Sequence, residues 1–304
     1  MSTRFNSGRP LAILAGLPIA AVALAFGDTI DEFTIVDGSV SNTERGLQYE
    51  RFTGAASQAD FFVGGVDHLY QNWWWYRTGT DTREYALGGV PGASTQVFGA
   101  VTSPFSARVV YKEPAGDGTI PNALEIDLEY TVSDIFPRSE KPDFGEKVIA
   151  FKIRNLLSQP QIVWFFSYND FDLGGTPGDD MAKIHGGGPH VQHQWDLDDP
   201  NHNPTQSIYK ASGTGLIAWE MALFPTIVDK LANPVIDDLT SMTTPIGGDV
   251  TGAFEWGFEL APAGEWGDEF VGSIVKEIGV VPEPATMLAL GVGLAALAAR
   301  RRRR

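Results

Sequence analysis

The amino-acid sequence predicts an all-β protein, folded as an antiparallel β-sandwich of jelly-roll type in a single domain. Short segments of alternating apolar and polar residues recur along the 304 residues, and glycine- and proline-rich turns separate them. In residues 124–130 the alternation is strict, with an acidic side chain at every second position. Such a strand has one face in a core and one in water, as in antiparallel sheets.

The other strands follow from the same pattern, and one segment departs from it. Residues 225–242 have apolar side chains at helical spacing after Pro225, which predicts a short helix that Pro234 interrupts. Neither an internal repeat nor a linker is visible in the sequence, so one domain is expected over residues 26–279. The segments predicted to form strands are 31–40, 69–77, 108–112, 123–132, 147–155, 161–168, 207–211, 215–222, 252–260 and 269–277.

Residues 1–25 have the composition of a secretory signal peptide rather than of a folded segment. Arg4 and Arg9 precede the apolar run Leu11–Phe26, and an Ala-Leu-Ala sequence ends at Ala25. A positive start, a short apolar stretch and a small-residue cleavage site together define this class of signal. Signal peptidase is therefore expected to remove this N-terminal signal helix during export through the inner membrane.

The C-terminal residues 280–304 consist of three parts in a fixed order. Pro282, Glu283 and Pro284 come first, and the uncharged stretch Ala285–Ala299 then predicts a short transmembrane helix. A basic block follows, which the positive-inside rule places on the cytoplasmic side of the membrane. This block consists of Arg300, Arg301, Arg302, Arg303 and Arg304.

This order of features resembles the PEP-CTERM sorting signal, which combines a Pro-Glu-Pro triplet, an apolar helix and a terminal arginine cluster. The chain is thereby identified as a PEP-CTERM sorting domain-containing protein. The resemblance implies transient anchoring in the inner membrane, followed by removal of the helix by exosortase, a transpeptidase-like membrane enzyme. It also implies delivery to the outer surface or extracellular matrix of a Gram-negative bacterium that makes exopolysaccharide, biofilm or floc.

Composition limits the partners of the region between the two ends. The formal net charge is −16 even though both ends of the chain are cationic, so the central region is strongly acidic. Such a charge excludes nucleic acid and anionic lipid as partners and is compatible with divalent cations. The chain has no cysteine, so no disulfide stabilises it after export, and thiol catalysis is excluded.

Acidic residues in turn-like segments form a candidate calcium site. Calcium takes about six to eight oxygen ligands, which closely spaced Asp and Asn residues on loops can supply. The same residues are common in turns that bind no metal, and neither acidic run has the EF-hand spacing. Asp179 and Asp180 lie nearby in sequence. The candidate ligands are Asp170, Asp172, Asp196, Asp198 and Asp199.

One predicted strand contains three consecutive tryptophans. Alternation along a regular strand puts Trp73 and Trp75 on one face and Trp74 on the other. If Trp73 and Trp75 are exposed, their indole rings are candidate glycan-binding surfaces. If they are buried, they belong to the core, where large aromatic side chains contribute most of the burial energy.

Together these observations predict a non-enzymatic structural or interaction protein of the cell surface or exopolysaccharide matrix. A glycan-binding module is the alternative, and a glycan-active enzyme is a third reading because carboxylate pairs are abundant. No catalytic residue is singled out, since the sequence contains no nucleophile elbow, zinc-protease motif or phosphate-binding loop. The expected partners are signal peptidase, exosortase, the inner membrane and exopolysaccharide.

Overall fold

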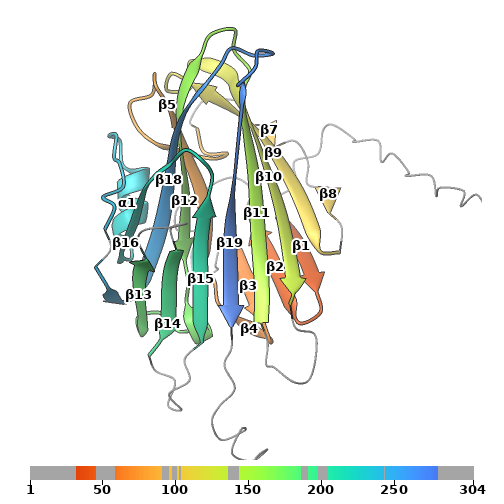
Figure 1. Ribbon diagram of the computed structural model, residues 1–304, viewed down its shortest axis with the longest axis vertical. Helices are drawn as coiled ribbons and strands as arrows, with labels where there is room; N and C mark the ends of the chain where they lie inside the picture. Colours follow the sequence, from red (N-terminus) through yellow and green to blue (C-terminus); the bar gives the residue numbers. More distant parts are fainter. Residues whose placement is uncertain are drawn as a thin grey trace, which may run out of the picture.

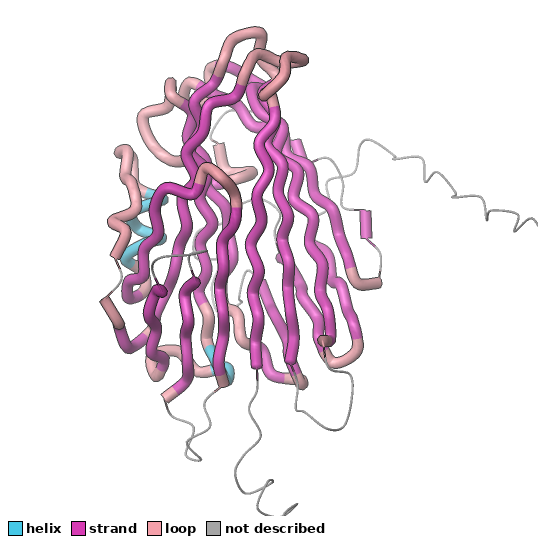
Figure 2. Tube along the Cα trace, in the orientation of Figure 1, coloured by secondary structure: helices cyan, strands magenta, loops and turns pink. Residues whose placement is uncertain are grey.

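The computed structural model describes residues 32–45, 59–90, 96–97, 101–102, 104–135, 144–185, 191–197, 205–242 and 244–279. Antiparallel strands make up most of this part of the chain (Figures 1 and 2). The all-β prediction is therefore confirmed. Among the described residues, no helix has the length and apolar character needed to cross a membrane. The helices predicted at the two ends of the chain lie outside the described residues.

The largest sheet has ten strands. Along the sheet they follow the order β17-β13-β14-β15-β19-β11-β10-β9-β7, and β8 also pairs with β9. Their bounds are β7 Gln96–Val97, β8 Val101–Thr102, β9 Ser106–Ala115, β10 Ile120–Asp134, β11 Phe144–Asn155, β13 Asp180–His185, β14 Val191–Asp196, β15 Gln206–Ser212, β17 Ile246–Gly248 and β19 Glu269–Gly279.

Two smaller sheets complete the structure. A five-stranded sheet has the order β16-β18-β12-β5-β6, and a four-stranded sheet has the order β1-β2-β3-β4. Their bounds are β1 Glu32–Asp37, β2 Val40–Arg45, β3 Ala59–Val63, β4 Val66–Asp67, β5 Gln71–Thr78, β6 Tyr85–Ala86, β12 Gln161–Asp170, β16 Leu216–Leu223 and β18 Val250–Leu260.

Both smaller sheets pack against the ten-stranded sheet. Phe151 on β11 lies 5.0 Å, between ring centroids, from Phe165 on β12 of the five-stranded sheet. Phe33 on β1 of the four-stranded sheet lies 5.1 Å from Tyr130 on β10. One apolar core contains all four side chains, so the described residues form a sandwich-like arrangement in which aromatic rings join the layers.

Strand β10 shows why the alternating pattern produces this arrangement. Leu124, Ile126 and Leu128 are fully buried in the core, whereas Glu129 between two buried positions is exposed. The predicted strand over 31–40 is wrong in one respect. Gly38, with a φ of 59°, turns the chain there into the β1–β2 hairpin, because glycine adopts this conformation without a steric cost.

The helix α1, Thr226–Ala232, covers the outer face of the five-stranded sheet (Figure 1). It confirms the first part of the helix predicted over 225–242. The helix ends before Asn233, where the following proline disfavours helical backbone. Below α1, Trp73 and Trp75 belong to a second apolar cluster that also contains Val228 of the helix.

The burial of these tryptophans corrects the glycan-binding prediction. Trp73 is 4% exposed and Trp75 is 1% exposed, so neither offers an indole face to a sugar. The reason lies in the layering. The ten-stranded sheet packs on one side of β5, and α1 packs on the other, so every residue of β5 is buried. The tryptophans are core residues in this structure.

Candidate metal centre

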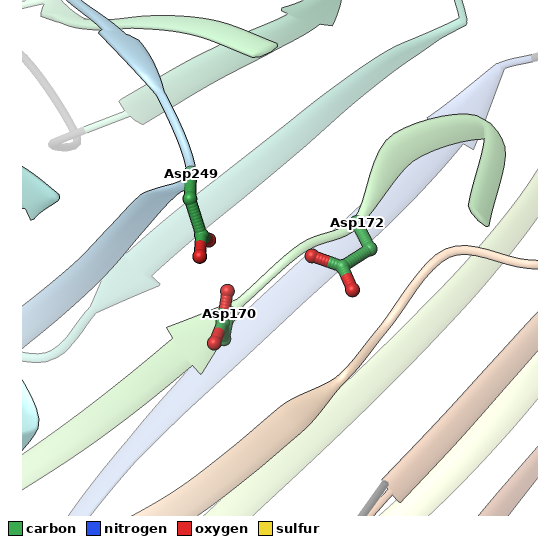
Figure 3. A group of neighbouring side chains, drawn as sticks. All are labelled: Asp170, Asp172 and Asp249. Carbon is green, nitrogen blue, oxygen red and sulfur yellow. The ribbon is translucent and has the colours of Figure 1, made fainter. Parts of the chain in front are cut away.

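Three aspartates meet where β12 ends and β18 begins. Asp170 is the last residue of β12, Asp172 follows it, and Asp249 immediately precedes β18. Each offers one carboxylate oxygen, and the three oxygens lie within 4.8 Å of one another. Figure 3 shows Asp170 and Asp172 on one segment, at the end of a strand and on the loop after it, and Asp249 on a neighbouring segment. We call Asp170, Asp172 and Asp249 the first cluster.

Strand pairing brings the first cluster together. Asp170 pairs with Thr251 in the antiparallel register of β12 and β18, so Asp249 lies just beyond the paired residues at the same end of the sheet. The chain leaves β12 through Asp172 into η1, a 3-10 turn over Leu173–Gly175 that lies at one end of the sheets (Figure 2). Asp249 is distant in sequence from Asp170 and Asp172, and the strand register brings it next to them.

A second group of aspartates lies at the nearby ends of β13 and β14. Asp180 and Asp196 face each other as a register pair, and Asp179 precedes β13. One carboxylate oxygen of each lies within 4.8 Å of the others. A β-carbon on Gly174 of η1 would lie 2.8 Å from Asp196, so η1 packs over this second cluster. The two clusters together form the acidic end of the protein.

Burial raises the pKa of several of these carboxyl groups. Desolvation by burial, followed by repulsion from Asp249, Asp67 and Asp179, raises the pKa of Asp172 to about 6. Burial also raises the pKa of Asp180 to about 8, and Asp179 and Asp196 add to the shift. In both cases the low-polarity surroundings and the neighbouring negative charges disfavour the ionised form.

Asp170 has the most unfavourable surroundings for an ionised carboxylate. It is 1% exposed, and burial, Asp172 and Asp249 raise its pKa well above the ordinary value. Its Oδ1 has no hydrogen-bond partner, whereas Oδ2 accepts only a long bond of 3.5 Å from the Tyr168 hydroxyl. Among the described residues, no lysine or arginine forms an ion pair with the first cluster.

The first cluster fits a hard divalent cation. Calcium binds carboxylate oxygens at about 2.3–2.6 Å, so ligand oxygens on one ion lie up to about 5 Å apart. The three carboxylates meet this limit, and an ion between them would give a counter-charge to the nearly fully buried Asp170, whose Oδ1 has no hydrogen-bond partner. A bound cation would also replace mutual repulsion by attraction and return the carboxyl groups to their ionised forms.

The structure divides the predicted calcium ligands. Asp170 and Asp172 lie together in the first cluster, and Asp196 lies in the second. Asp198 and Asp199 lie outside the described residues, as does the sorting signal formed by Pro282, Glu283, Pro284 and Arg300–Arg304. Sequence reasoning missed Asp249. It is a single acidic residue after two glycines, and only its pairing position marks it.

Sequence reasoning also missed several strands, among them the two that hold the second cluster. It treated the segments around Asp180 and Asp196 as irregular, whereas β13 and β14 hold both residues in the ten-stranded sheet. The signal was present in the alternation of buried Ala182 and Ile184 with more exposed neighbours. The glycine-rich segment between the two strands obscured that pattern.

Comparison with known proteins identifies one segment of the chain. Residues 280–304 match the model of the PEP-CTERM protein-sorting motif, which confirms the prediction made from the triplet, the apolar stretch and the arginine block. No curated protein matches the chain.

Several solved structures align with this chain at low sequence identity. A bacterial glucoamylase complexed with acarbose aligns with a TM-score of 0.49 and 11% identity, over 84% of this chain and 32% of that chain. A galactose mutarotase related enzyme from Lactobacillus acidophilus aligns with a TM-score of 0.40 and 10% identity, over 83% and 99%. An amine oxidase from Aspergillus nidulans aligns with a TM-score of 0.41 and 8% identity, over 90% and 55%.

Proposed function

Taking as a premise that this chain is a PEP-CTERM protein, exported and processed by exosortase, we propose that it is a calcium-binding, non-enzymatic protein of the cell surface or exopolysaccharide matrix. The first cluster holds the calcium ion. The ion would neutralise the carboxylates of the first cluster. The protein would take it up after export, when it first meets extracellular calcium.

The observation that carries this proposal is the buried carboxylate of Asp170. An ionised carboxylate that is 1% exposed requires hydrogen bonds or a counter-charge. Its Oδ1 has no partner, and the nearby charged groups Asp172 and Asp249 are also acidic. A divalent cation supplies the counter-charge, and oxygen-only ligands favour calcium or magnesium over softer metals.

Calcium also offers a way to associate with a matrix. The chain has a net charge of −16, and acidic proteins repel acidic polysaccharides unless a divalent cation neutralises the contact. The burial of Trp73 and Trp75 withdraws the sugar-stacking surface considered from the sequence. Association through calcium is therefore favoured over a glycan-binding module built on those tryptophans.

Processing at both ends determines the form that reaches the surface. In this proposal the mature protein lacks residues 1–25 and the apolar stretch Ala285–Ala299, and it is released at the outer surface of a Gram-negative bacterium. Intact-mass analysis of the surface form tests this step. A surface protein that retains the C-terminal stretch in a host with exosortase would contradict it.

Calorimetric titration of the full chain with calcium tests the metal site. We expect one high-affinity ion at the first cluster and weaker binding of magnesium, which needs a more regular ligand geometry. Asp170→Asn keeps the shape of the side chain and removes its charge, so it should weaken calcium binding by at least tenfold. Asp229→Asn, at an exposed position on α1, is the matched control and should leave binding unchanged. Equal calcium affinity in Asp170→Asn and the unaltered chain would refute the site.

Co-sedimentation with the producer's own exopolysaccharide tests the matrix role. The protein should sediment with the polysaccharide in calcium and remain in solution with chelator. Asp170→Asn should remain in solution in both conditions. Binding that persists in chelator would separate matrix association from the calcium site and overturn this part of the proposal.

A further inference from the structure

A second group of buried charges lies inside the sandwich, apart from the acidic end. It contains two lysines, one glutamate and three asparagines, and each is at most 1% exposed. We call this group the polar layer. It consists of Asn42 and Glu44 on β2, Asn72 on β5, Lys147 on β11, Asn169 on β12 and Lys276 on β19.

Strand register aligns the polar layer across the core. Lys147 and Lys276 face each other as a register pair of β11 and β19. Asn72 and Asn169 form a register pair of β5 and β12 in the opposite sheet. Asn42 and Glu44 are two residues apart on β2, so both point to the same side of that strand.

Lys147 contacts an amide and an acid at once. Its Nζ lies 2.5 Å from Oδ1 of Asn42 and forms an ion pair with Glu44. The amide nitrogen Nδ2 of Asn42 has no hydrogen-bond partner. An amine, a carboxamide and a carboxylate are therefore in mutual contact, and both side chains of the ion pair are at most 1% exposed.

The charges of the polar layer favour an uncharged amine. It contains two lysines and only one acid. Desolvation by burial lowers the pKa of Lys147, against the attraction of Glu44, Asp67 and Asp60. Burial and the charge of Lys147 lower the pKa of Lys276 well below its ordinary value. A desolvated lysine is the usual form of a nucleophilic amine in proteins.

We propose that Lys147 and Asn42 form an intramolecular isopeptide bond, with Glu44 carrying the protons. Glu44 accepts a proton from the Lys147 ammonium, and the free amine attacks Cγ of Asn42. The tetrahedral intermediate loses a second proton from Nζ, Nδ2 is protonated through Glu44, and the Cγ–Nδ2 bond breaks. One ammonium and one carboxamide become one secondary amide and one ammonium ion, and Glu44 returns to its carboxylate form. No oxidant or cofactor is needed.

The fold supplies what this reaction requires. The folded sheets hold the amine against the amide, and such fixed proximity can replace a very high reactant concentration. Glu44 is placed for general acid–base catalysis, because it contacts the nitrogen that must lose protons. The core excludes water, which prevents hydrolysis of the amide. The ring of Tyr130, 5.6 Å from Nζ, forms part of the surrounding wall.

Contacts with Glu44 favour Lys147 over Lys276 as the linked lysine. Lys276 Nζ lies 2.6 Å from Oδ1 of Asn72 and also contacts Asn169, so amides surround it as well. Its contacts include no carboxylate, because Glu44 reaches this part of the layer only through a 3.4 Å bond from Asn72 Nδ2. Without a base at its nitrogen, Lys276 remains an unlinked amine in this proposal.

Peptide mapping of the full chain by mass spectrometry tests the proposal directly. Trypsin should fail to cut after Lys147. A branched peptide that joins the Asn42 and Lys147 segments should appear, lighter by one ammonia than the two peptides together. This readout does not depend on processing at either end or on calcium. Separate, unmodified peptides that contain Asn42 and Lys147 in folded protein would overturn the assignment.

Variants then assign the role of Glu44. Glu44→Gln keeps the side-chain shape and cannot accept the proton, so the branched peptide should be lost from the soluble, folded fraction. Glu259→Gln makes the same change at an exposed position on β18 and should retain the branched peptide, which makes it the matched control. A branched peptide in Glu44→Gln, or a link from Lys276 to Asn72 or Asn169, would contradict this assignment.

Discussion

The polar layer and the acidic end are both buried groups of charge, but only the polar layer contains both signs. In the polar layer, Lys147 contacts Glu44, and the amides of Asn42, Asn72 and Asn169 bind the lysine nitrogens. In the first cluster, the charges are all negative, and Asp170 retains an unpartnered oxygen. Buried charges persist in folded proteins when they are paired or bind metal. The polar layer thus receives a counter-charge from within the chain, whereas the acidic end requires a cation from outside.

The polar layer and the first cluster have adjacent residues on β12. Asn169 contacts Lys276 in the polar layer, and the next residue, Asp170, belongs to the first cluster. Strand β12 therefore carries one residue of each group: Asn169 belongs to the polar layer, where Glu44 supplies a counter-charge, and Asp170 belongs to the first cluster, which has no counter-charge among the described residues. If this distinction is correct, charge removal should destabilise the polar layer and stabilise the calcium-free acidic end.

The largest expected effect is at Glu44. Glu44→Gln removes the carboxylate that forms an ion pair with the buried nitrogen of Lys147, and breaking a buried pair of this kind typically lowers the free energy of unfolding by about 3–5 kcal/mol. Loss of the proposed cross-link adds to this destabilisation, because a link across a loop of this length restricts the unfolded chain. Urea unfolding followed by tryptophan fluorescence measures the difference.

A glutamate outside the core provides the control for this effect. Glu259→Gln, at an exposed position on β18, should change the free energy of unfolding by less than about 0.5 kcal/mol. If the two substitutions had similar effects, Glu44 would not act as the counter-charge of Lys147, and the contrast between the polar layer and the acidic end would be wrong.

The next effect is stabilisation by calcium. A ligand that binds only the folded state at about 100 times its dissociation constant adds about 2.7 kcal/mol to the free energy of unfolding. Asp170→Asn should abolish this gain. In chelator the same variant should be more stable than the unaltered chain, because asparagine avoids the cost of burying or protonating a carboxyl group beside Asp172 and Asp249.

The informative result is that Asp170→Asn should lower the stability in calcium and raise it in chelator. A merely structural role of Asp170 would make the variant less stable in both conditions. If Asp170→Asn were destabilised in chelator, its carboxylate would have a partner within the protein, and the contrast with the polar layer would fail. Thermal unfolding in the two buffers gives both values from one preparation.

The sequence indicated local features of this structure and left their partners undetermined. The alternation in residues 124–130 and the helix after Pro225 depend on neighbouring residues, and both are confirmed. Lys147 was also visible as a charged residue in phase with the buried Ile149 and Phe151. Its partners Asn42 and Glu44 were not, because they come from another sheet and only tertiary packing brings them close.

The acidic end shows the same limit. Asp170 and Asp172 are close in sequence and were predicted together. Asp249 joins them only through the register of β12 and β18. The exposure of Trp73 and Trp75 also could not be decided by alternation, because α1 covers the face that the strand pattern leaves open. The alternation of residues along a strand therefore indicates which side chains share a face, whereas the helices and sheets packed on that face determine whether those side chains are buried.

A smaller effect is expected from pH in the presence of chelator. Burial raises the pKa of Asp172 to about 6 and that of Asp180 to about 8, whereas the unfolded value is about 4. Between these values the folded state binds more protons than the unfolded state, so stability must fall as pH rises from about 4 to about 8. Calcium should remove part of this slope, because it favours the ionised carboxylates.

The difference between calcium and chelator isolates the acidic end from other groups. Burial also raises the pKa of Glu84, Glu113 and Glu255 to about 7, and these residues contribute the same slope in both buffers. Their contribution cancels in the comparison. If the curves of stability against pH were parallel with and without calcium, the carboxyl groups of the acidic end whose pKa is raised would not contact the ion.

The smallest expected effect distinguishes the first cluster from the second. Gly174 and Gly178 both have positive φ, 72° and 90°, so alanine at either position should cost about 1 kcal/mol in backbone strain. Only Gly174→Ala also places a β-carbon near a carboxylate, 2.8 Å from Asp196 Oδ2, whereas Gly178 has nothing within 4 Å. The difference between the variants therefore reports on Asp196.

If calcium binds the first cluster alone, both variants should keep the full calcium-dependent gain in stability. A smaller gain in Gly174→Ala than in Gly178→Ala would show that the second cluster shares the ion, and the acidic end would then act as one site.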